Sequence, residues 1–565
     1  MFSDSLSQSK LPKGATVAPI IIATDKTQFT SFSGGKSTYP VYLTLGNIPK
    51  SIRQKPLKHA CVLIVYLPVD SSAKLKGTTL KKKEVSICNQ RIFHAAMWFV
   101  LGPLIKAGKT GVRMTGGNGE VRNVYPILAC YVADFPEQCL VACTKYGTCP
   151  KCTSSAKKLQ DPDPGPPRSR QWTLDVIENT KQTSNTKNQF YKKCMEQDVL
   201  GSVYDPFWKD FPLCDIHKAI TPNILHQLYQ GVLKHIITWC QTLMTPEELD
   251  ARLCVLPPAF GVRHFKNGFS ALSQVSGPER KNMAKVLLGC LVGSLAKPGI
   301  KAVRGLLDFI YIAQYKSHDE ITLGYLKDAL DRFQKNKNFF IKTKICLDLN
   351  IPKFHSLLHY IECIKLFDTT DNYNTEAFEK FHINFTKEGW RASNHRDEFP
   401  QMITWLSRQE KISMFDNYLE SIDSTEKPPT ELKQKPIIKI AKYPPYPGRL
   451  ITTIEQAHNT HTFSQHLHEY LNTFLAKNSR TSNTVAQLYS LPFQHVDCYT
   501  QFKFHPNSLT DDYDHQDIEE NDTVKAIPRS SKNVEGRMDT VIVRTGDEPE
   551  AVSIGGKLCF FIIGL

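Results

Sequence analysis

The chain has 565 residues, and its 41% hydrophobic and 22% charged content is typical of a soluble globular protein with one to several domains. It has no run of about eighteen uncharged apolar residues and no apolar secretory signal, which argues against a membrane-spanning or secreted protein. The net charge of +15 makes a polyanionic partner, above all nucleic acid, a candidate.

Four apolar runs in the N-terminal part predict β-strands, at 19–25, 39–45, 61–68 and 126–134. A helical pattern over roughly 85–104 lies between the third run and the fourth. Asp25 ends the first run and Asp134 ends the fourth. Three strands, a helix and a fourth strand follow the order of an RNase H-like core, although many mixed α/β domains share that order.

The predicted fold class is α/β, with an RNase H-like mixed-sheet core, a large α-helical insertion and a small C-terminal appendage. Helical periodicity over 224–242, 281–295, 301–314 and 322–336 indicates the insertion. We expect these parts: 1–15, a flexible N-terminus; 16–152, the first part of the core; 153–350, the mainly helical insertion; 351–422, the C-terminal helices of the core; 423–450, a Pro/Lys-rich linker; 451–507, a small appendage; and 508–565, an acidic, partly disordered tail.

Carboxylates at strand ends are the first candidates for chemistry, because they lie at the rim of a sheet. Asp25 and Asp134 meet this condition, although either one alone fits a strand-end or helix-capping role. Glu376 and Glu379 lie at a predicted helix start, where acids commonly compensate the helix dipole. Gathered at one rim, such acids bind Mg²⁺ or Mn²⁺, and two ions can activate a water or a 3′-hydroxyl for phosphodiester transfer.

A second candidate site combines cysteines and histidines. Sixteen cysteines without a secretory signal indicate a reducing compartment, where spaced pairs suggest metal ligands. Cys149 and Cys152 have the spacing of half a zinc site, and His355 and His359, at i and i+4 of a predicted helix, can supply the other half. The alternative is two buried free cysteines and an unrelated histidine pair.

Several long stretches of the chain resemble the Plavaka transposases, which belong to the CACTA (EnSpm-like) cut-and-paste elements of mushroom-forming fungi. The resemblance covers about residues 15–420. It is carried by IIIATDKTQFTSFSGGKSTYPVYLTLGNIPKSIRQKP, YVADFPEQCLVAC, YDPFWKDFP, TPNILHQLYQGVLKH, RGLLDFIYIAQY and YNTEAFEKFHINFTKEGWRASNHRDE.

The resemblance implies a catalytic core with a DDE triad, interrupted by a helical insertion before the last acid. Asp25 matches the first acid and Asp134 the second. The third is Glu379 or Glu376; we favour Glu379, because related transposases place a histidine pair shortly before the catalytic glutamate. The same layout favours structural zinc at the two cysteines and two histidines named above.

The resemblance also identifies departures and candidate DNA contacts. Relatives usually have Asp-x-x-His where this chain has Asn223 and His226. If that acid takes part in catalysis this copy is inactive, whereas in a structural role asparagine keeps its hydrogen bonds. Relatives carry an N-terminal end-recognition region that this chain is expected to lack, so base readout would be poor. Arg391, His395 and Arg396 are candidate phosphate contacts.

The sequence therefore predicts a DDE-type DNA transposase core that uses Mg²⁺ or Mn²⁺ for catalysis and Zn²⁺ for structure. It would act on double-stranded DNA in the nucleus as a homo-oligomer. No membrane partner is expected. The alternative is an inactivated or domesticated relic that binds DNA without cutting it. A nuclease built on the same core ranks last.

Overall fold

The computed structural model describes residues 10–29, 36–69, 81–116, 119–257, 259, 262–272, 275–424, 443–458, 462–478, 490–491, 493–499, 501–504, 522–527, 537–538, 541–544, 552–555 and 560–562. The chain divides into two compact units, Met1–Glu420 and Ser421–Leu565. Among the described residues, no helix combines the length and hydrophobicity needed to cross a bilayer.

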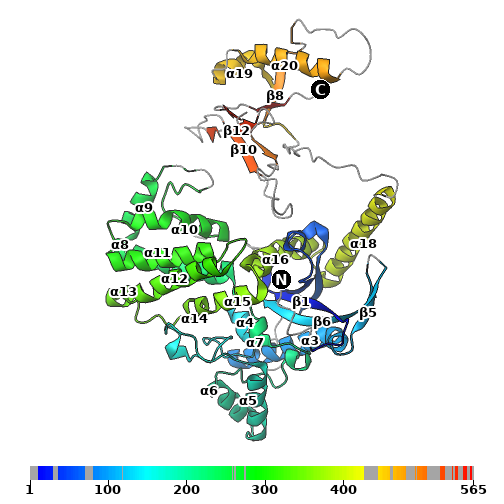
Figure 1. Cartoon of the computed structure of the whole chain (residues 1–565), viewed down its shortest axis with the longest axis vertical. Coiled ribbons are helices and arrows are strands. Elements are labelled where there is room, and N and C mark those ends of the chain that lie inside the picture. The colour runs from blue at the N-terminus through cyan, green and yellow to red at the C-terminus, as the bar shows by residue number, and fades with distance from the viewer. Residues whose placement is uncertain are drawn as a thin grey trace. The chain divides into compact units, whose positions relative to one another are not determined.

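A mixed six-stranded sheet forms the centre of the first unit (Figure 1). Its strands are β1 (Thr16–Thr24), β2 (Thr27–Gln28), β3 (Ser37–Leu45), β4 (Cys61–Leu67), β5 (Val112–Thr115) and β6 (Val121–Val132). β3 is antiparallel to β1 and β4 is antiparallel to β3, whereas β6 is parallel to β1. β5 forms an antiparallel pair with β6, and β2 pairs with β3. The four predicted strands are present; β5, which is exposed throughout and short, was not predicted.

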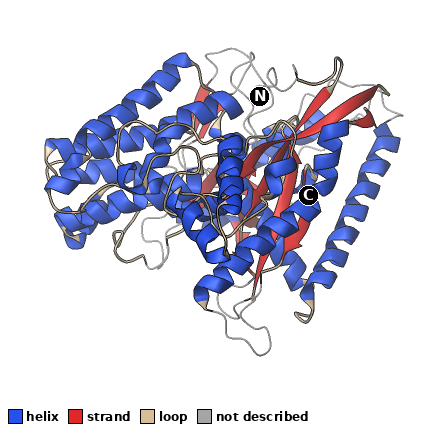
Figure 2. Cartoon of the chain, turned by 90° about the horizontal axis from the view of Figure 1, so that it is seen from below, coloured by secondary structure: helices blue, strands red, loops and turns tan. Residues whose placement is uncertain are grey.

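Helices cover both faces of this sheet, so that β1 is buried on both sides (Figure 2). Ile20 and Ile22 face one hydrophobic cluster, which includes Leu101 of α3 (Lys82–Thr110). Ile21 faces the other cluster, which includes Phe381 of α16 (Thr375–Phe381). This burial explains why the sequence of β1 is a continuous apolar run that ends where the chain leaves the sheet. The molecule is a mixed α/β protein, as predicted.

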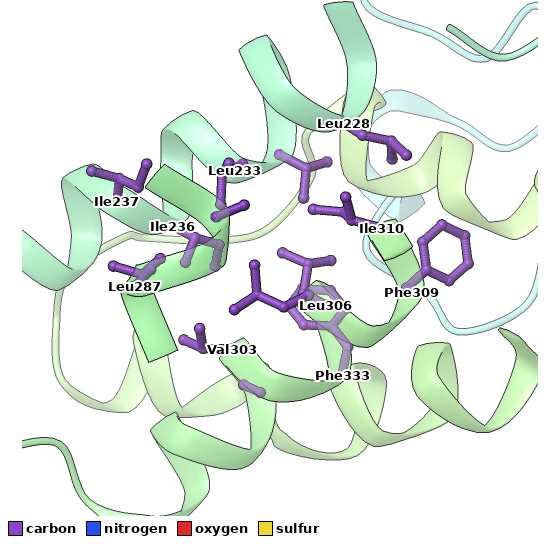
Figure 3. Packing of buried hydrophobic residues seen from close by; sticks show 14 of the residues in the cluster. Leu228, Leu233, Ile236, Ile237, Leu287, Val303, Leu306, Phe309, Ile310 and Phe333 are labelled. Atoms are coloured by element: carbon purple, nitrogen blue, oxygen red, sulfur yellow. The ribbon is translucent and has the colours of Figure 1, made fainter. Parts of the chain in front are cut away.

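A helical bundle follows the sheet in the chain. It contains η5 (Ile224–Leu233), a π-helix, and α8 (Lys234–Met244), α9 (Pro246–Val255), α10 (Gly277–Leu291), α11 (Lys297–Ile312), α12 (Glu320–Asn336) and α13 (Asn338–Lys342). Figure 3 shows the core of this bundle, where Ile236, Leu287, Leu306 and Phe333 come from four different helices. The four predicted helical segments are present within a few residues, except that the first consists of η5 and α8.

Shorter helices connect these parts of the first unit. They are α2 (Lys50–Arg53), η1 (Pro56–Lys58), α4 (Phe135–Val141), η3 (Ala156–Lys158), α5 (Arg170–Gln182), α6 (Lys187–Glu196), η4 (Phe207–Asp210), α7 (Ile216–Ala219), α14 (Pro352–His355), η6 (Ser356–His359), α15 (Tyr360–Phe367), η7 (Thr370–Tyr373), η8 (His382–Lys387) and α17 (Glu388–Arg391). The long helix α18 (Glu398–Ser424) follows them.

The second unit contains α19 (Ile451–His458), α20 (Phe463–Asn478) and short strands. The strands are β7 (Tyr446–Leu450), β8 (His495–Tyr499), β9 (Gln501–Phe504), β10 (Asp522–Ile527), β11 (Arg537–Met538), β12 (Val541–Arg544), β13 (Val552–Gly555) and β14 (Phe560–Ile562). Ile451, Leu467 and Val496 belong to its small core. The strands from β10 onward fall in the segment predicted as an acidic tail. Residues 1–9, most of the predicted linker and the acidic run 511–520 lie outside the described residues.

Candidate active site and metal centre

Asp25 and Asp134 leave the sheet next to each other. In the parallel pair of β1 and β6, Ala23 is opposite Val132, and each aspartate lies two residues further along its strand's direction. Because parallel strands keep their chains in step, both carboxylates lie at the same edge of the sheet. The charge of Asp25 helps to raise the pKa of Asp134, which agrees with this proximity.

Asp134 also caps a helix, so the structural role considered for it is real. Its Oδ1 accepts a hydrogen bond from the backbone N–H of Glu137 at 3.1 Å, at the start of α4. Burial raises the pKa of Asp134, and this effect outweighs the hydrogen bond from Glu137, which lowers it. Capping therefore leaves the carboxylate in an environment where a nearby positive charge would stabilise its ionised form.

Glu379 reaches the same site through His226. The His226 Nε2 lies 3.3 Å from Glu379 Oε1. Burial lowers the pKa of His226, but the hydrogen bond and charge of Glu379, together with the charges of Asp25 and Asp134, raise it above its usual value. The imidazole of His226 therefore contacts Glu379 of α16 and is influenced by the charges of Asp25 and Asp134, which follow β1 and β6.

Glu376 points to a different neighbour. Its Oε1 lies 2.6 Å from Lys281 Nζ of α10, and its Oε2 accepts a hydrogen bond from Asn374 Nδ2 at 3.2 Å. These contacts place Glu376 in the packing between α16 and the helical bundle. The two glutamates that the sequence left as alternatives therefore contact different residues: Glu376 contacts Lys281, and Glu379 contacts His226.

Asn223 joins two elements of the site, η5 and α16. Its Oδ1 accepts hydrogen bonds from the His226 backbone N–H at 2.9 Å and from Thr375 Oγ1 at 3.0 Å. The first bond caps η5 and orients the residue that contacts Glu379, and the second connects η5 with α16. The buried Nδ2 of Asn223 has no hydrogen-bond partner among the described residues.

Glu137 lies in the first turn of α4, three residues after Asp134, and was not among the residues predicted from the sequence. This side chain is 8% exposed and accepts a hydrogen bond from Thr24 Oγ1. Burial raises the pKa of Glu137 to about 8; hydrogen bonds from Thr24 and Tyr39 oppose the rise, and the charges of Asp134 and Asp25 add to it. A glutamate in the first turn of a helix reads in sequence as ordinary dipole compensation, so only its burial reveals it.

Cys149, Cys152, His355 and His359 form a candidate metal centre. Their four possible ligand atoms all lie within 4.8 Å of one another, and all four residues are buried. Cys149 Sγ is 3.3 Å from His359 Nε2, and Cys152 Sγ is 3.1 Å from His355 Nε2. The sequence predicted that the two histidines share one α-helix, and this prediction is wrong: α14 ends at His355, and the 3₁₀ turn η6 carries His359.

Neighbouring groups hold these ligands ready for a metal. The Nδ1 of His355 lies 3.1 Å from the carbonyl oxygen of Leu159, so an Nδ1–H there leaves the Nε2 lone pair facing Cys152. Burial lowers the pKa of His359, which favours the neutral imidazole that binds metals. Arg168 Nε donates to the carbonyl oxygens of Cys149 and Cys152, at 2.9 and 3.0 Å.

The predicted DNA contacts lie on the surface. Arg391 ends α17, and Arg391, His395 and Arg396 are all exposed. The His395 ring stacks on Trp390 with centroids 4.3 Å apart, and Trp390 stacks on Phe29 at 4.4 Å. Phe29 follows Asp25 by four residues and comes directly after β2, so this stack connects the basic stretch with the end of β2.

The fold and its two clusters define a class: a mixed α/β protein that has acids at one sheet edge and a separate, buried Cys/His centre. Residues 2–240 match the family model described as Plavaka transposase. The match includes Asp25, Asp134, both cysteines and His226, and it supports a Plavaka-type transposase. No curated protein matches the chain.

Proposed function

We propose that the chain is the catalytic core of a DDE-type cut-and-paste transposase of the CACTA type. It would cleave DNA at the ends of a mobile element and join the freed 3′-hydroxyl to target DNA. The observation that carries this proposal is that Asp25 and Asp134 end adjacent parallel strands, while His226, whose pKa their charges raise, contacts Glu379. The family match over residues 2–240 supports it independently.

The order of the strands supports an RNase H-like core. β4, β3 and β1 form a consecutive antiparallel series, and β6 adds to β1 in parallel after the helix α3. A single parallel bridge between Tyr131 and Ile220 continues the order on the far side of β6. In this arrangement the helical bundle is inserted in the chain between β6 and α16. After the bundle, the chain reaches α16, which carries Glu379.

The residues fit the divalent metal that this chemistry needs. Asp25, Asp134 and Glu379 offer only oxygen donors, which suit Mg²⁺ or Mn²⁺. When bound there, such ions supply an activated water or 3′-hydroxyl and neutralise charge on the transferring phosphate. The chain's own part is to hold the three carboxylates: α4 fixes Asp134 through its cap, and His226 fixes Glu379.

Glu379 is the third acid of this proposal. Glu376 is occupied by Lys281, and its ion pair holds α16 against the bundle. Asn223 adds a second attachment through Thr375. The helix that carries Glu379 is therefore fastened to the inserted bundle, which gives the insertion a direct role in placing the last acid.

The Cys/His centre is proposed to hold structural Zn²⁺. Two thiolates and two imidazoles form the donor set of a closed, tetrahedral zinc site. Cys149 and Cys152 follow Asp134 in the chain, and His359 precedes Glu379. A metal at this centre would join the two segments and keep the second and third acids in register.

DNA is the proposed substrate, and its phosphates would meet exposed basic residues. Arg391, His395 and Arg396 are the proposed contacts, and the net charge of +15 favours a polyanion. Because the substrate is chromosomal DNA, we propose nuclear localisation. Cleavage at two element ends would require a homo-oligomer.

The relic interpretation depends mainly on Asn223. The contacts of this residue are those of a helix cap and of a side-chain link, and both use an acceptor oxygen that asparagine and aspartate share. The substitution therefore does not remove a hydrogen bond that the site needs. An active enzyme is accordingly the first proposal, and a DNA-binding relic is the alternative.

The experiment is Mn²⁺-dependent nicking and strand transfer on labelled DNA that carries candidate element ends. Wild type is compared with Asp134→Ala, Glu379→Ala and Asn223→Asp. Activity in wild type that both alanine variants lose supports the triad. Activity in Asn223→Asp alone would show an inactivated transposase, and binding without any cleavage would favour the relic.

A further inference from the structure

A buried histidine that the sequence analysis did not select points at Asp25. His382 begins η8 and is 4% exposed. Its Nε2 lies 3.4 Å from Asp25 Oδ2, and its Nδ1 lies 2.9 Å from the hydroxyl oxygen of Tyr42. Tyr42 belongs to β3, next to β1, and is fully buried. The three side chains form a line from the interior of the sheet to the acidic cluster.

The chemistry of this line sets which nitrogen of His382 carries the proton. Burial raises the pKa of Tyr42, so its hydroxyl keeps its proton and can donate to Nδ1. A neutral imidazole that accepts at Nδ1 carries its hydrogen at Nε2, facing Asp25. The opposite tautomer would turn a lone pair toward a carboxylate oxygen, which is repulsive. Among the described residues His382 Nε2 has no hydrogen-bond partner, so the arrangement places a buried potential donor 3.4 Å from Asp25 Oδ2 without a formed hydrogen bond.

We propose that His382 is a positioning residue, which holds one oxygen of Asp25 so that the other faces the metal, and that Tyr42 fixes the tautomer that allows this. The inference rests on the proposed function, because it concerns the same acidic site. With this proposal each acid has a group that positions it: the α4 backbone for Asp134, His226 for Glu379 and His382 for Asp25.

The difference in exposure between Asp25 and His382 explains why Asp25 needs a positioning residue. Asp25 follows the last residue of β1, and its side chain is 38% exposed, so the strand itself does not fix its rotamer. The ring of His382 is enclosed by Tyr42, with ring centroids 5.4 Å apart. A buried donor beside this partly exposed carboxylate would reduce the rotamer freedom that metal binding would otherwise remove.

The test is Mn²⁺ binding by the full chain without DNA, followed by electron paramagnetic resonance of the free ion. Wild type is compared with Asp25→Ala, His382→Leu, His382→Gln and Tyr42→Phe. Leucine removes the donor, whereas the amide nitrogen of glutamine replaces Nε2–H. His235→Leu is the matched control, because His235 is a partly buried imidazole of the bundle with ring contacts to Trp239 and Phe354.

We expect His382→Leu to weaken Mn²⁺ binding by about 10- to 100-fold, as for other outer partners of metal ligands. His382→Gln should recover most of the affinity, Tyr42→Phe should have a smaller effect, and the control should bind as wild type does. Melting temperatures are measured for every variant. The Mn²⁺ concentration for half-maximal nicking should rise in the same order.

Three results would overturn the inference. If Asp25→Ala weakens binding and His382→Leu does not, the acidic site stands and His382 has no positioning role. If leucine and glutamine at 382 lower affinity and melting temperature equally, the residue is only structural. If wild type shows no Mn²⁺ binding that depends on Asp25, the proposed metal site itself fails and the inference fails with it.

Discussion

The acidic cluster and the Cys/His centre are joined by a short stretch of chain, since α4 leads from Asp134 toward Cys149. They differ in their exposure to solvent. The side chains of Asp25 and Glu379 are 38% and 43% exposed, whereas all four residues of the Cys/His centre are buried. Exposed oxygen donors let a hard ion keep waters and meet a substrate, but a buried set of sulfur and nitrogen donors is closed to it. The proposed function assigns catalysis to the acidic cluster and a structural role to the Cys/His centre.

The largest effect on stability is expected at the closed cluster. Cys152→Ser should release the bound metal and lower the free energy of unfolding by about 4 kcal/mol or more, because loss of a structural metal is among the most destabilising changes. Metal content and denaturant unfolding measure the two effects. Cys240→Ser is the control: Cys240 is buried in the helical bundle, away from the candidate ligands. Equal metal content in both variants would contradict the account.

The open cluster should respond in activity rather than in stability. Glu379→Gln is expected to slow nicking on the order of 10²- to 10³-fold while unfolding stays close to wild type, because the change removes charge from the site. Glu376→Gln is its matched control. It loses only the partly exposed ion pair with Lys281, for about 1 kcal/mol of stability or less. Loss of nicking in the control, with retention in Glu379→Gln, would exchange the roles of the two glutamates.

The two regions should also respond to pH in opposite directions. Burial raises the pKa of Glu137 from 4.5 to about 8, so the stability that its protonated form gives is complete below pH 4.5 and is lost as pH rises through 8. Burial lowers the pKa of His217, beside the cysteine loop, from 6.5 to about 3, so its contribution is present above pH 6.5 and is lost as pH falls toward 3.

Denaturant unfolding across pH separates these effects. Glu137→Gln should flatten the alkaline side of the stability profile, and His217→Gln should flatten the acid side. Each pKa unit corresponds to about 1.4 kcal/mol. Unchanged profiles in both variants would show that neither group titrates as its burial indicates.

The smallest effect is expected for Asn223→Asp. Aspartate keeps the acceptor for His226 N–H and Thr375 Oγ1 and removes the unpartnered Nδ2. Stability should change by less than about 1 kcal/mol, since the two residues are similar helix caps. Nicking should change only a few-fold. Recovery of activity from an inactive wild type would instead identify a lost catalytic acid.

Local patterns were enough to predict that Asp25 and Asp134 lie at strand ends, because each follows an apolar run. The spacing of the cysteines and histidines left a metal centre as one of two alternatives, and the family resemblance favoured it; the structure brings the four residues together. The grouping of Glu379 with the aspartates depended on the family resemblance, because over two hundred residues of chain separate Asp134 from Glu379.

The supporting residues could not be predicted from local sequence. Glu137 and His382 occupy ordinary helical positions, and only tertiary packing buries them beside the acids. The ion pair of Glu376 could not be predicted from local sequence either, since Lys281 lies in another helix. Periodicity reports which face of an element is buried, but not which polar groups meet across elements.

The most direct test of the central claim is the anomalous scattering of Mn²⁺ in crystals of the full chain bound to DNA. We expect peaks bounded by the carboxylates of Asp25, Asp134 and Glu379, with Glu376 still paired with Lys281. A separate zinc peak should lie among Cys149, Cys152, His355 and His359. Mn²⁺ bound elsewhere, with the three acids free of metal at saturating concentration, would contradict the account.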